Sequence, residues 1–488
     1  LTSHLPSPII HAPAAFMVAV AASILLLSFA IVSVSAFAMI DPSSAPTPSP
    51  PHFRVAAVWS KAGVGTSAVL EPDPRTAPTG AKKKGPRVAF DVGSTPIFDE
   101  VVPAKVVCVS HGHVDHVGGI FGHARAHAVT YGGEAPTYYV PIELVPHLES
   151  AREAMSAMDG MCLDPSPSDG DGDGDGDGDG AVRARRRNES LMKMNVVGVR
   201  PGEEIELKGI KGRDGKRLLL RTFAVSHGSH PALGYILLTR SPPGLKPEYA
   251  GLPGKEIGAL ARSGVRIKEE EGRVRVEAVY TGDTCLEGLL CASPTEEDEG
   301  ENGGAEGGGA GAAPDDDEAR RNKRSRRYLF QGLRESPLLL CECTFLDAEL
   351  RDMAPAKGHM HVLDVIEALR GHGWGIDDAD GGGGSGNGEE GGGERRRELV
   401  LFHISGRHRP ASVALDLLAD AIPVCLADKT GVAVASLLSD KEKGGQTREE
   451  ERAFLADIVG GDGCVNLGEY IRWREEMIRE ERRVEDVK

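Results

Sequence analysis

The chain has 488 residues, of which 40% are hydrophobic and 62 are glycine. This length would allow two or three domains, but low-complexity tracts occupy much of it, so we expect one core domain of ordinary size. The formal net charge of −17 argues weakly against a nucleic-acid partner, because phosphate neutralisation needs lysine and arginine. Much of the acid lies in Asp/Gly and Glu/Gly tracts and in the C-terminal tail, so the average charge says little about the patterned segments.

Residues 1–51 predict a targeting presequence. The segment from Ala14 to Ile40 has no charged residue. It has the length to span a bilayer or to form the apolar region of a signal peptide. It ends in small residues around Phe37, and Pro/Ser-rich, acid-poor sequence follows. This arrangement resembles a two-part plastid presequence, in which a signal peptide precedes a transit peptide.

Plastid import is therefore our first hypothesis for localisation. The second is a membrane anchor in the secretory system, in which residues 14–40 make a transient or anchoring membrane contact. A cytosolic or mitochondrial location is the third, for the case that the true N-terminus differs. The 8 cysteines include no Cys-x-x-Cys pair, which indicates reduced thiols. Cys341 and Cys343 could form a metal site, but a buried strand of alternating small apolar residues is the preferred interpretation.

Three low-complexity insertions interrupt the patterned sequence. They cover approximately residues 164–190, which include an Asp-Gly repeat, residues 292–327 and residues 377–397. Such composition cannot bury a core and predicts solvated loops. The sequence around the insertions predicts one domain over residues 52–438.

Residues 439–488 predict a charged helical tail. Asp462 to Glu469 resembles the second half of an EF-hand loop, but Ile458 and Gly460 stand where calcium needs oxygen ligands. We interpret this segment as a helix-turn-helix remnant, and Glu475 to Arg483 as a solvated helix face.

Short apolar runs between the insertions predict buried strands. They are Val106–Val109, Leu218–Leu220, Tyr235–Leu238, Val274–Val279, Leu338–Leu340 and Leu399–Phe402. Helical spacing of apolar residues predicts helices over His361–Arg370 and Leu144–Met158. Strands that end in polar clusters indicate a layered α/β fold with its site along one edge.

A metal-binding loop is predicted directly after the Val106–Val109 strand. The sequence His-Gly-His-Val-Asp-His places His111, His113, Asp115 and His116 within six residues. Neutral imidazole suits zinc, and the carboxylate adds a harder ligand. Alternation beyond the strand end directs the first two histidines one way, while the other two side chains begin the next turn. One loop can thus serve two adjacent metals.

Further ligand candidates follow later strands. His227 and His230 precede the strand at Tyr235, Asp283 follows the Val274–Val279 strand, and His403 follows the Leu399–Phe402 strand. Each alone would more often be a turn residue. Together, after the metal loop, they form the ligand set of a dinuclear hydrolase, in which paired metals activate water and hold a phosphodiester.

At this point the sequence resembles a known family. His-x-His-x-Asp-His followed by two glycines is typical of the metallo-β-lactamase superfamily. The later motifs resemble tRNase Z, especially its short plant-like form. They are the segments around Glu342 to Asp347, Gly358 to His361 and His403 to Arg407, together with Phe90 to Gly93 and Pro247 to Val265. The likeness covers roughly residues 53 to 438 without the insertions.

The resemblance implies a four-layer αββα metallo-β-lactamase sandwich and an endoribonuclease that removes the 3′ trailer from precursor tRNA. It also implies a homodimer with two Zn²⁺ per subunit. His111, His113 and His227 would hold one zinc, and Asp115, His116 and His403 the other, with Asp283 bridging. Asp115 would also orient the attacking hydroxide. Glu342 and His359 would protonate the departing ribose 3′-oxygen, with His361 as the competing donor.

Two departures from the family pattern leave alternatives open. The loop at His227 is one residue longer than usual, so His230 could replace it as ligand. The arm that grips tRNA is expected between His116 and His227, where no clear arm motif stands. Another superfamily hydrolase, such as a glyoxalase-II-like thioesterase or an arylsulfatase-like enzyme, is the alternative function, and a non-catalytic scaffold is a further one.

Overall fold

The computed structural model describes the greater part of the chain after the presequence. The described residues are 52–76, 85–95, 97–161, 192–211, 216–290, 314–374, 376, 397–408, 411–433, 459–460 and 462–486. The predicted presequence, with residues 14–40, and the predicted insertion at 164–190 lie outside them. No helix within the described ranges is long and apolar enough to cross a membrane.

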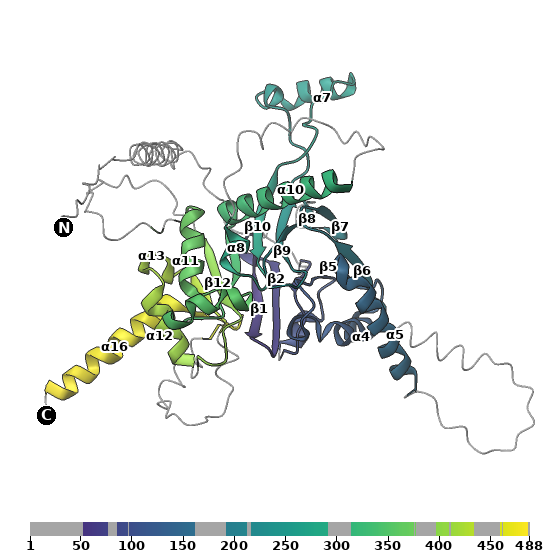
Figure 1. The fold of residues 1–488 in the computed structure, drawn as a ribbon. Helices are drawn as coiled ribbons and strands as arrows, with labels where there is room; N and C mark the ends of the chain where they lie inside the picture. The colour runs from purple at the N-terminus through teal and green to yellow at the C-terminus, as the bar shows by residue number, and fades with distance from the viewer. Residues whose placement is uncertain are drawn as a thin grey trace, which may run out of the picture. The chain divides into compact units, whose positions relative to one another are not determined.

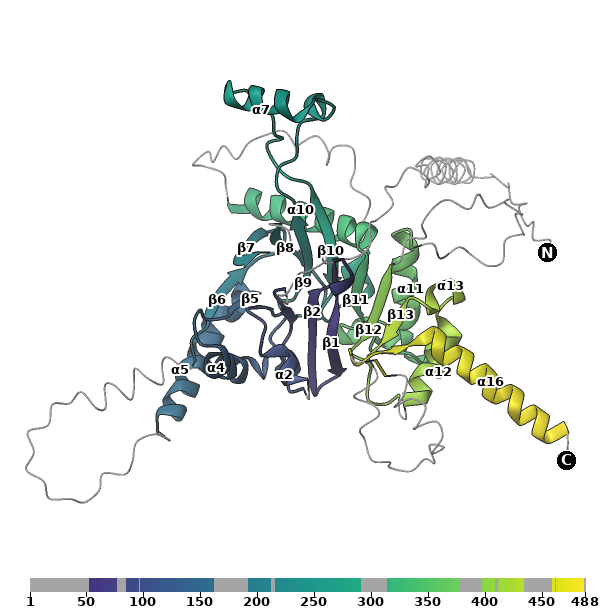
Figure 2. The same ribbon diagram turned by 180° about the vertical axis from the view of Figure 1, so that it is seen from behind.

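Two β-sheets form the centre of the fold (Figures 1 and 2). The first contains, in spatial order, β1 (Phe53–Lys61), β2 (Gly65–Pro72), β3 (Val88–Phe90), β4 (Val106–Cys108), β5 (Thr137–Pro141) and β6 (Asn195–Val199). The second contains β14 (Val465–Asn466), β13 (Thr430–Val432), β12 (Glu398–Phe402), β11 (Leu338–Glu342), β10 (Val274–Tyr280), β9 (Leu233–Arg240), β8 (Arg217–Ala224) and β7 (Glu204–Lys211).

Both sheets mix parallel and antiparallel pairing. In the first sheet, β1, β2 and β3 pair antiparallel, and β3 to β6 pair parallel. In the second, β7 to β10 form an antiparallel meander and β10 to β13 pair parallel, with β14 antiparallel at the edge. Except for the partly exposed edge strand β6, the parallel strands are short and mostly apolar because both of their faces are covered.

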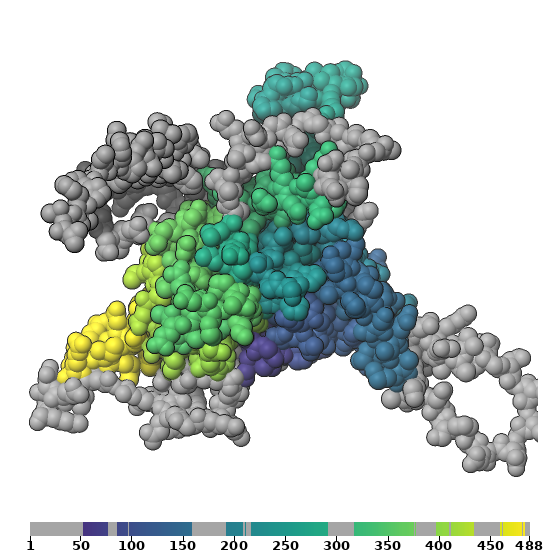
Figure 3. Space-filling view, viewed as in Figure 1, coloured from purple at the N-terminus to yellow at the C-terminus, as the bar shows by residue number. Residues whose placement is uncertain are grey.

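Helices cover the outer face of each sheet. On the first sheet these are α2 (Phe98–Val101), α4 (Ile120–Tyr131) and α5 (Val145–Met161). On the second they are α10 (Pro314–Glu335), α11 (Val362–Gly371), α12 (Ala411–Ala421), α13 (Val424–Ala427) and α16 (Leu467–Asp486). Figure 3 shows α10 at the surface of this face. The short helices α3 (Val114–Val117) and α8 (Leu286–Leu289) follow strand ends, and α7 (Gly254–Arg262) lies between β9 and β10.

Three apolar cores separate these layers, one between the sheets and one under each set of helices. The core between the sheets contains a stack of aromatic rings. The ring centroids of Phe90 and Tyr280 lie 4.8 Å apart, and those of Tyr280 and Phe402 lie 5.1 Å apart. Each of these residues ends a strand, so the stack fixes three strand ends relative to one another. The predicted four-layer αββα sandwich is confirmed.

The predicted strands and helices are present with small shifts at their ends. The apolar runs correspond to β4, β8, β9, β10, β11 and β12, and the two predicted helices correspond to α5 and α11. His361 begins α11 through a reciprocal cap, in which its ring accepts from the backbone amide of Leu363 and Asp364 accepts from the amide of His361. Cys341 lies in the buried strand β11, as expected.

Two segments differ from the sequence-based expectation. Residues 314–327, which we assigned to a loop insertion, form the first part of α10. The run from Arg320 to Arg327 has no apolar residue, so its helical period becomes visible only from Tyr328 onward. The remainder of that insertion, residues 292–313, and residues 377–396 of the third lie outside the described residues.

The C-terminal segment is also more closely integrated than a solvated tail would be. A turn leads into β14, which pairs with β13, and then into α16. Residues 439–458, where the first helix of the interpreted helix-turn-helix would lie, are outside the described residues. The amide of Val58 in β1 donates to the carbonyl of Asp462 at 2.6 Å. Val465, Leu467 and Tyr470 are buried in the core under the second sheet, so apolar burial holds this segment in the fold.

Glu277 of β10 is a fully buried carboxylate. It joins His52, which directly precedes β1, to the second sheet. It accepts hydrogen bonds from the backbone amide of His52 at 3.1 Å and from the hydroxyl of Thr239, and it lies 2.8 Å from Nδ1 of His52. Burial alone would raise the pKa of Glu277, but His52, Arg275 and Thr239 together hold it below the ordinary value of 4.5.

This lowered pKa predicts a pH-dependent contribution to stability. The ionised carboxylate stabilises the fold above the ordinary pKa, and this contribution is lost as pH falls through the lower, folded-state pKa. Glu277→Gln should therefore lower the free energy of unfolding at pH 7 by about 2 kcal/mol, and the difference should shrink in acid. Urea unfolding over a pH series measures both. Glu270→Gln, at an exposed residue, should change little, and a difference independent of pH would contradict the assignment.

Candidate metal centre

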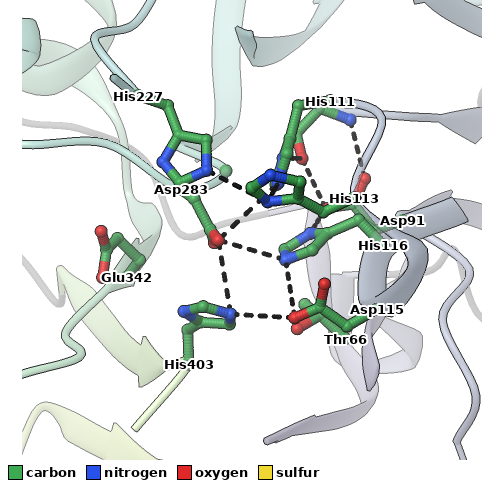
Figure 4. A network of polar contacts seen from close by, with 12 residues as sticks. Thr66, Asp91, His111, His113, Asp115, His116, His227, Asp283, Glu342 and His403 are labelled. Carbon is green, nitrogen blue, oxygen red and sulfur yellow. Dashed lines mark hydrogen bonds and ion pairs between the residues drawn. The ribbon is translucent and has the colours of Figure 1, made fainter. Parts of the chain in front are cut away.

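The predicted ligands meet where strand ends from both sheets face each other (Figure 4). His111 and His113 follow β4 of the first sheet, and Asp115 and His116 lie on the short helix α3. The second sheet contributes side chains that follow β8, β10, β11 and β12. They are His227, Asp283, Glu342 and His403; Glu342 is the last residue of its strand. The segments that carry them are far apart in the sequence, and the aromatic stack between the sheets brings their ends together.

Three imidazoles form the first group of ligand atoms. Nδ1 of His113 lies 2.9 Å from Nε2 of His111 and 3.3 Å from Nε2 of His227. These three nitrogens lie close enough together to bind one ion. The alternation predicted beyond β4 accounts for the first two, and the turn after β8 supplies the third.

The second group combines two imidazoles with a carboxylate. Oδ2 of Asp115 lies 3.7 Å from Nε2 of His116 and 3.5 Å from Nε2 of His403. Asp283 lies between the two groups, with Oδ2 at 3.2 Å from His116, 3.3 Å from His403 and 3.8 Å from Nε2 of His111. One carboxylate is therefore within reach of both ligand groups.

Unsatisfied buried atoms show that this cluster fits divalent metal. Nε2 of His116 and Oδ1 of Asp283 are both buried and lack a hydrogen-bond partner. Burying such polar atoms without a partner costs about 1–3 kcal/mol each, whereas a cation would satisfy both. Imidazole with carboxylate is also a donor set that zinc accepts.

Four of the five candidate ligand histidines contact a neighbouring group through their second ring nitrogen. Nδ1 of His111 lies 3.0 Å from the Ser110 hydroxyl, and Nδ1 of His227 lies 2.7 Å from the carbonyl of Gly358. The same atom of His403 lies 3.1 Å from the hydroxyl of Thr344. Such contacts fix the ring orientation and the tautomer, so that the other nitrogen faces the cluster.

Asp91 holds the fourth ring and organises the metal loop. Its Oδ2 lies 2.7 Å from Nδ1 of His116 and accepts from the hydroxyls of Tyr280, at 2.6 Å, and Ser110, at 2.8 Å. Asp91 directly follows β3 with a positive φ of 55°, and His403 directly follows β12 with a φ of 64°. This conformation is uncommon for residues other than glycine. Sequence analysis did not name Asp91 as a site residue, although a carboxylate after a buried strand is the signal that identified Asp283.

The pKa shifts of the histidines differ between the two groups of ligand atoms. Burial lowers the pKa of His111, His113 and His227, which keeps these rings neutral and able to bind metal. Burial also disfavours the charged forms of His116 and Asp283, but the opposite charges beside them prevail. They raise the pKa of His116 and hold that of Asp283 well below its usual range.

A carboxylate–histidine pair stands beside the ligand groups. Oε1 of Glu342 lies 3.2 Å from Nδ1 of His359, which in turn lies 4.0 Å from Oδ2 of Asp283. Glu342 is fixed by the backbone amides of Thr284, Met360 and Thr344 at 3.0–3.1 Å. Burial disfavours the protonated ring of His359, but the Glu342 carboxylate and its hydrogen bond raise the pKa above the ordinary value.

Three other histidines have different positions. His361 caps α11, and its Nε2 lies 2.9 Å from the carbonyl of Asp347, so both ring nitrogens are engaged. His408 is buried and contacts Leu346 and Asp347. His230 is exposed, and its ring centroid lies 4.5 Å from that of His113. It is not among the groups whose ligand atoms converge in the described part of the chain.

We predict that His227 and not His230 contributes to metal binding. His227→Ala removes one of three converging nitrogens and should lower the metal content of the purified protein below that of the wild type. His230→Ala should leave the content unchanged, because this exposed ring belongs to none of the groups whose ligand atoms converge. Elemental analysis of both variants decides between the two, and the reverse pattern would assign the ligand to His230.

No arm-like structure is described in the interval where it was expected. Between His116 and His227 the described residues form α4, α5 and β5 to β8, and residues 162–191 lie outside them. A helix-bearing segment instead connects β9 to β10, which is between His227 and Asp283. It contains α7, which has no buried residue, and both views place α7 beyond the ends of β9 and β10 (Figures 1 and 2).

Comparisons with known proteins place this arrangement in a family. No protein-family model matches the chain. It is 28% identical to tRNase Z TRZ1 of Arabidopsis thaliana over 198 residues, which are 41% of this chain and 55% of that protein. It is 30% identical to the nuclear ribonuclease Z of Triticum aestivum over 180 residues, which are 37% of this chain and 79% of that protein. The chain belongs to the ribonuclease Z family.

The chain is also similar to a third plant protein and to two solved structures. The chloroplastic tRNase Z TRZ2 of Arabidopsis thaliana is 24% identical over 282 residues, 58% of this chain and 57% of that protein. The chain thus spans little more than half the length of the two Arabidopsis proteins. Among solved structures, the short form of human tRNase Z matches with a TM-score of 0.35 at 12% identity, covering 73% of this chain and 93% of that one. The metallo-beta-lactamase fold protein YhfI of Bacillus subtilis matches with a TM-score of 0.36 at 11% identity, covering 76% and 93%.

Proposed function

We propose that the chain is a metal-dependent endoribonuclease that removes the 3′ trailer from precursor tRNA. The observation that carries this proposal is the convergence of seven ligand side chains beside the Glu342–His359 pair. They are His111, His113, Asp115, His116, His227, Asp283 and His403. The tRNase Z and ribonuclease Z names of the relatives support the substrate class.

The ligand groups are suited to two zinc ions per subunit. His111, His113 and His227 would hold one ion, and Asp115, His116 and His403 the other, with Asp283 shared between them. The chemistry that such a pair supplies is a nucleophile derived from water near neutral pH and stabilisation of charge on the attacked phosphodiester. The neutral rings of the first group can donate lone pairs to a cation. The carboxylates of Asp115 and Asp283 supply negative charge that offsets part of the charge of two divalent cations.

Asp115 has a second function in this proposal, to orient the attacking water. Its Oδ2 accepts a hydrogen bond at 2.8 Å from the amide of Gly63, in the turn between β1 and β2. This bond limits rotation of the carboxylate. Gly63 has a positive φ of 72°, which glycine adopts without the strain that a side chain would cause.

His359 would donate the proton that the departing ribose 3′-oxygen needs, because an alkoxide is a poor leaving group. The ring is partly exposed, at 18% of its side-chain surface, whereas Glu342 is fully buried. His359 can therefore reach a substrate atom, and Glu342 can only orient the ring and stabilise its charged form. His361 is unsuited to this role because both of its ring nitrogens have partners in the protein.

Substrate contacts outside the centre are proposed for the segment that connects β9 to β10. Its exposed helix α7 is flanked by Lys246, Arg266 and Lys268, and it could contact RNA away from the cleaved bond. We also retain the homodimer and plastid location as proposals. The latter is supported by the presequence pattern and by the chloroplastic relative.

Incubation of the purified chain with labelled precursor tRNA tests the function. We expect one cleavage directly after the discriminator nucleotide, loss of cleavage with chelator, and recovery with zinc. A thioester and an aryl sulfate, assayed in parallel, test the alternative hydrolases. Turnover of either one without RNA cleavage by metal-loaded protein would refute the proposal.

A further inference from the structure

Helix α10 carries a concentrated run of positive charge. Residues 320–327 contain six lysines and arginines and no acidic residue, in a chain whose formal net charge is −17. The side chains of Arg320, Arg324 and Arg326 are exposed. Arg320 and Arg324 are one helical turn apart, about 6 Å along the axis, so their guanidinium groups leave the same flank of the helix. Arg326 lies about 200° around the axis from Arg324 and leaves the opposite flank.

The second half of α10 fixes the orientation of this basic run. Tyr328, Leu329 and Leu333 are buried in the core that covers the second sheet. A Cβ at Gly332 would lie 2.7 Å from the side chain of Ile236 in β9, so the helix sits directly on the sheet. The helix cannot rotate without exposing this apolar face, and the arginines are therefore held outward.

The basic run is also anchored to the end of the strand β8, which leads to the candidate ligand His227. Within it, the hydroxyl of Ser325 accepts a hydrogen bond at 2.8 Å from the amide of Ala224, the last residue of β8. Ala224 stands three positions before the candidate ligand His227. On the other side, Nε of Arg324 donates to the carbonyl of Gly202 at 3.2 Å, which leaves its remaining N–H groups available.

Of the acidic side chains near the run, Asp317 and Glu204 are engaged by other cations, whereas Glu318 of the same helix is exposed. Asp317 pairs with Arg321 on the same helix. Glu204 of β7 accepts from Arg221 at 2.7 Å and from Arg240 at 2.8 Å. The guanidinium of Arg221 also lies over the ring of Tyr328, with 4.4 Å between its Cζ and the ring centroid. These acids are thus drawn away from the exposed arginines.

We propose that Arg320, Arg324 and Arg326 bind phosphates of the RNA strand next to the metal centre. The inference rests on the proposed function, because it takes RNA as the substrate held at that centre. Guanidinium groups form bidentate contacts with phosphate, and neutralising a backbone phosphate releases counterions. An RNA strand that is cut at the metal centre also contacts the protein surface around that centre. The basic run of α10 lies at the end of β8, which leads to His227.

The test compares two triple variants of the full chain. Arg320→Gln/Arg324→Gln/Arg326→Gln removes the charge on α10, and glutamine retains helix propensity close to that of arginine. Arg479→Gln/Arg482→Gln/Arg483→Gln removes the same charge from exposed positions on α16. Binding to labelled tRNA that lacks a 3′ trailer is measured over a salt series, so that no turnover intervenes.

The α10 variant should bind roughly tenfold more weakly at low salt, with a slope of log K against log salt that is shallower by about 2, which corresponds to three lost phosphate contacts. The KM for precursor tRNA should rise without loss of kcat, and the α16 variant should match the wild type.

Equal affinity and slope in the α10 variant and the wild type would overturn the proposal. If the wild type binds tRNA as described but cuts no precursor, the proposed function is refuted. The proposal that the arginines of α10 bind RNA is then retained.

Discussion

His359→Ala should lower the kcat for precursor cleavage by roughly 10²- to 10⁴-fold, the usual contribution of a positioned general acid. The substitution removes the ring that Glu342 holds 3.2 Å away and leaves the seven ligands in place. Metal content measured by elemental analysis should therefore equal that of the wild type. Since the carboxylate raises the pKa of His359, the proton is retained to higher pH than on an ordinary histidine. Wild-type kcat should fall as pH rises through that raised pKa, and the variant should lose this decline.

His361→Asn is the matched control for that experiment. Asparagine is a preferred N-cap residue, so it should retain the start of α11 while removing the competing imidazole. We expect nearly wild-type cleavage and metal content. A large loss of cleavage in this variant, or loss of metal in His359→Ala, would show that the roles of the two histidines have been exchanged or misassigned.

Asp283→Ala is expected to have the larger effect on the metal centre itself. This carboxylate lies within 3.8 Å of ligand atoms in both groups. Its loss should reduce the bound metal below two ions per chain and lower kcat by roughly 10³-fold or more, since even outer-shell changes cost about 10–100-fold. Elemental analysis and cleavage at saturating zinc measure the two effects separately.

Asp91→Asn provides a graded comparison. Asp91 holds His116 through Nδ1 and faces no metal directly, so its loss should weaken metal affinity by about 10–100-fold. Excess zinc should therefore restore most of the cleavage in Asp91→Asn and little in Asp283→Ala. Full recovery of Asp283→Ala with zinc would contradict its assignment as the shared ligand.

Much of the centre could be predicted from the sequence because its residues follow recognisable strands. A buried apolar run that ends in histidine or aspartate identifies both the strand and the edge at which the side chain lies. His111, Asp283 and His403 all follow this pattern, and the short-range spacing in the metal loop predicts the remainder. The choice of His359 over His361 depended on resemblance alone, and the structure supplies the physical reason, since His361 is committed to capping a helix.

The features that could not be predicted depend on contacts between distant segments. The aromatic stack of Phe90, Tyr280 and Phe402 joins three strands, and no local pattern identifies its members as partners. The first half of α10 has no large apolar residue, so it can be recognised as helix only through the buried half that follows. The short strand β14 exists because Val465 pairs with β13 and enters the core, which a charged, low-complexity context conceals.

A zinc titration of the metal-free chain, with precursor cleavage recorded at each addition, tests the central claim most directly. Two converging ligand groups that share Asp283 predict that cleavage rises with added zinc and levels off at two ions per chain. Full cleavage with one ion per chain, or cleavage that needs no added metal, would contradict the dinuclear centre.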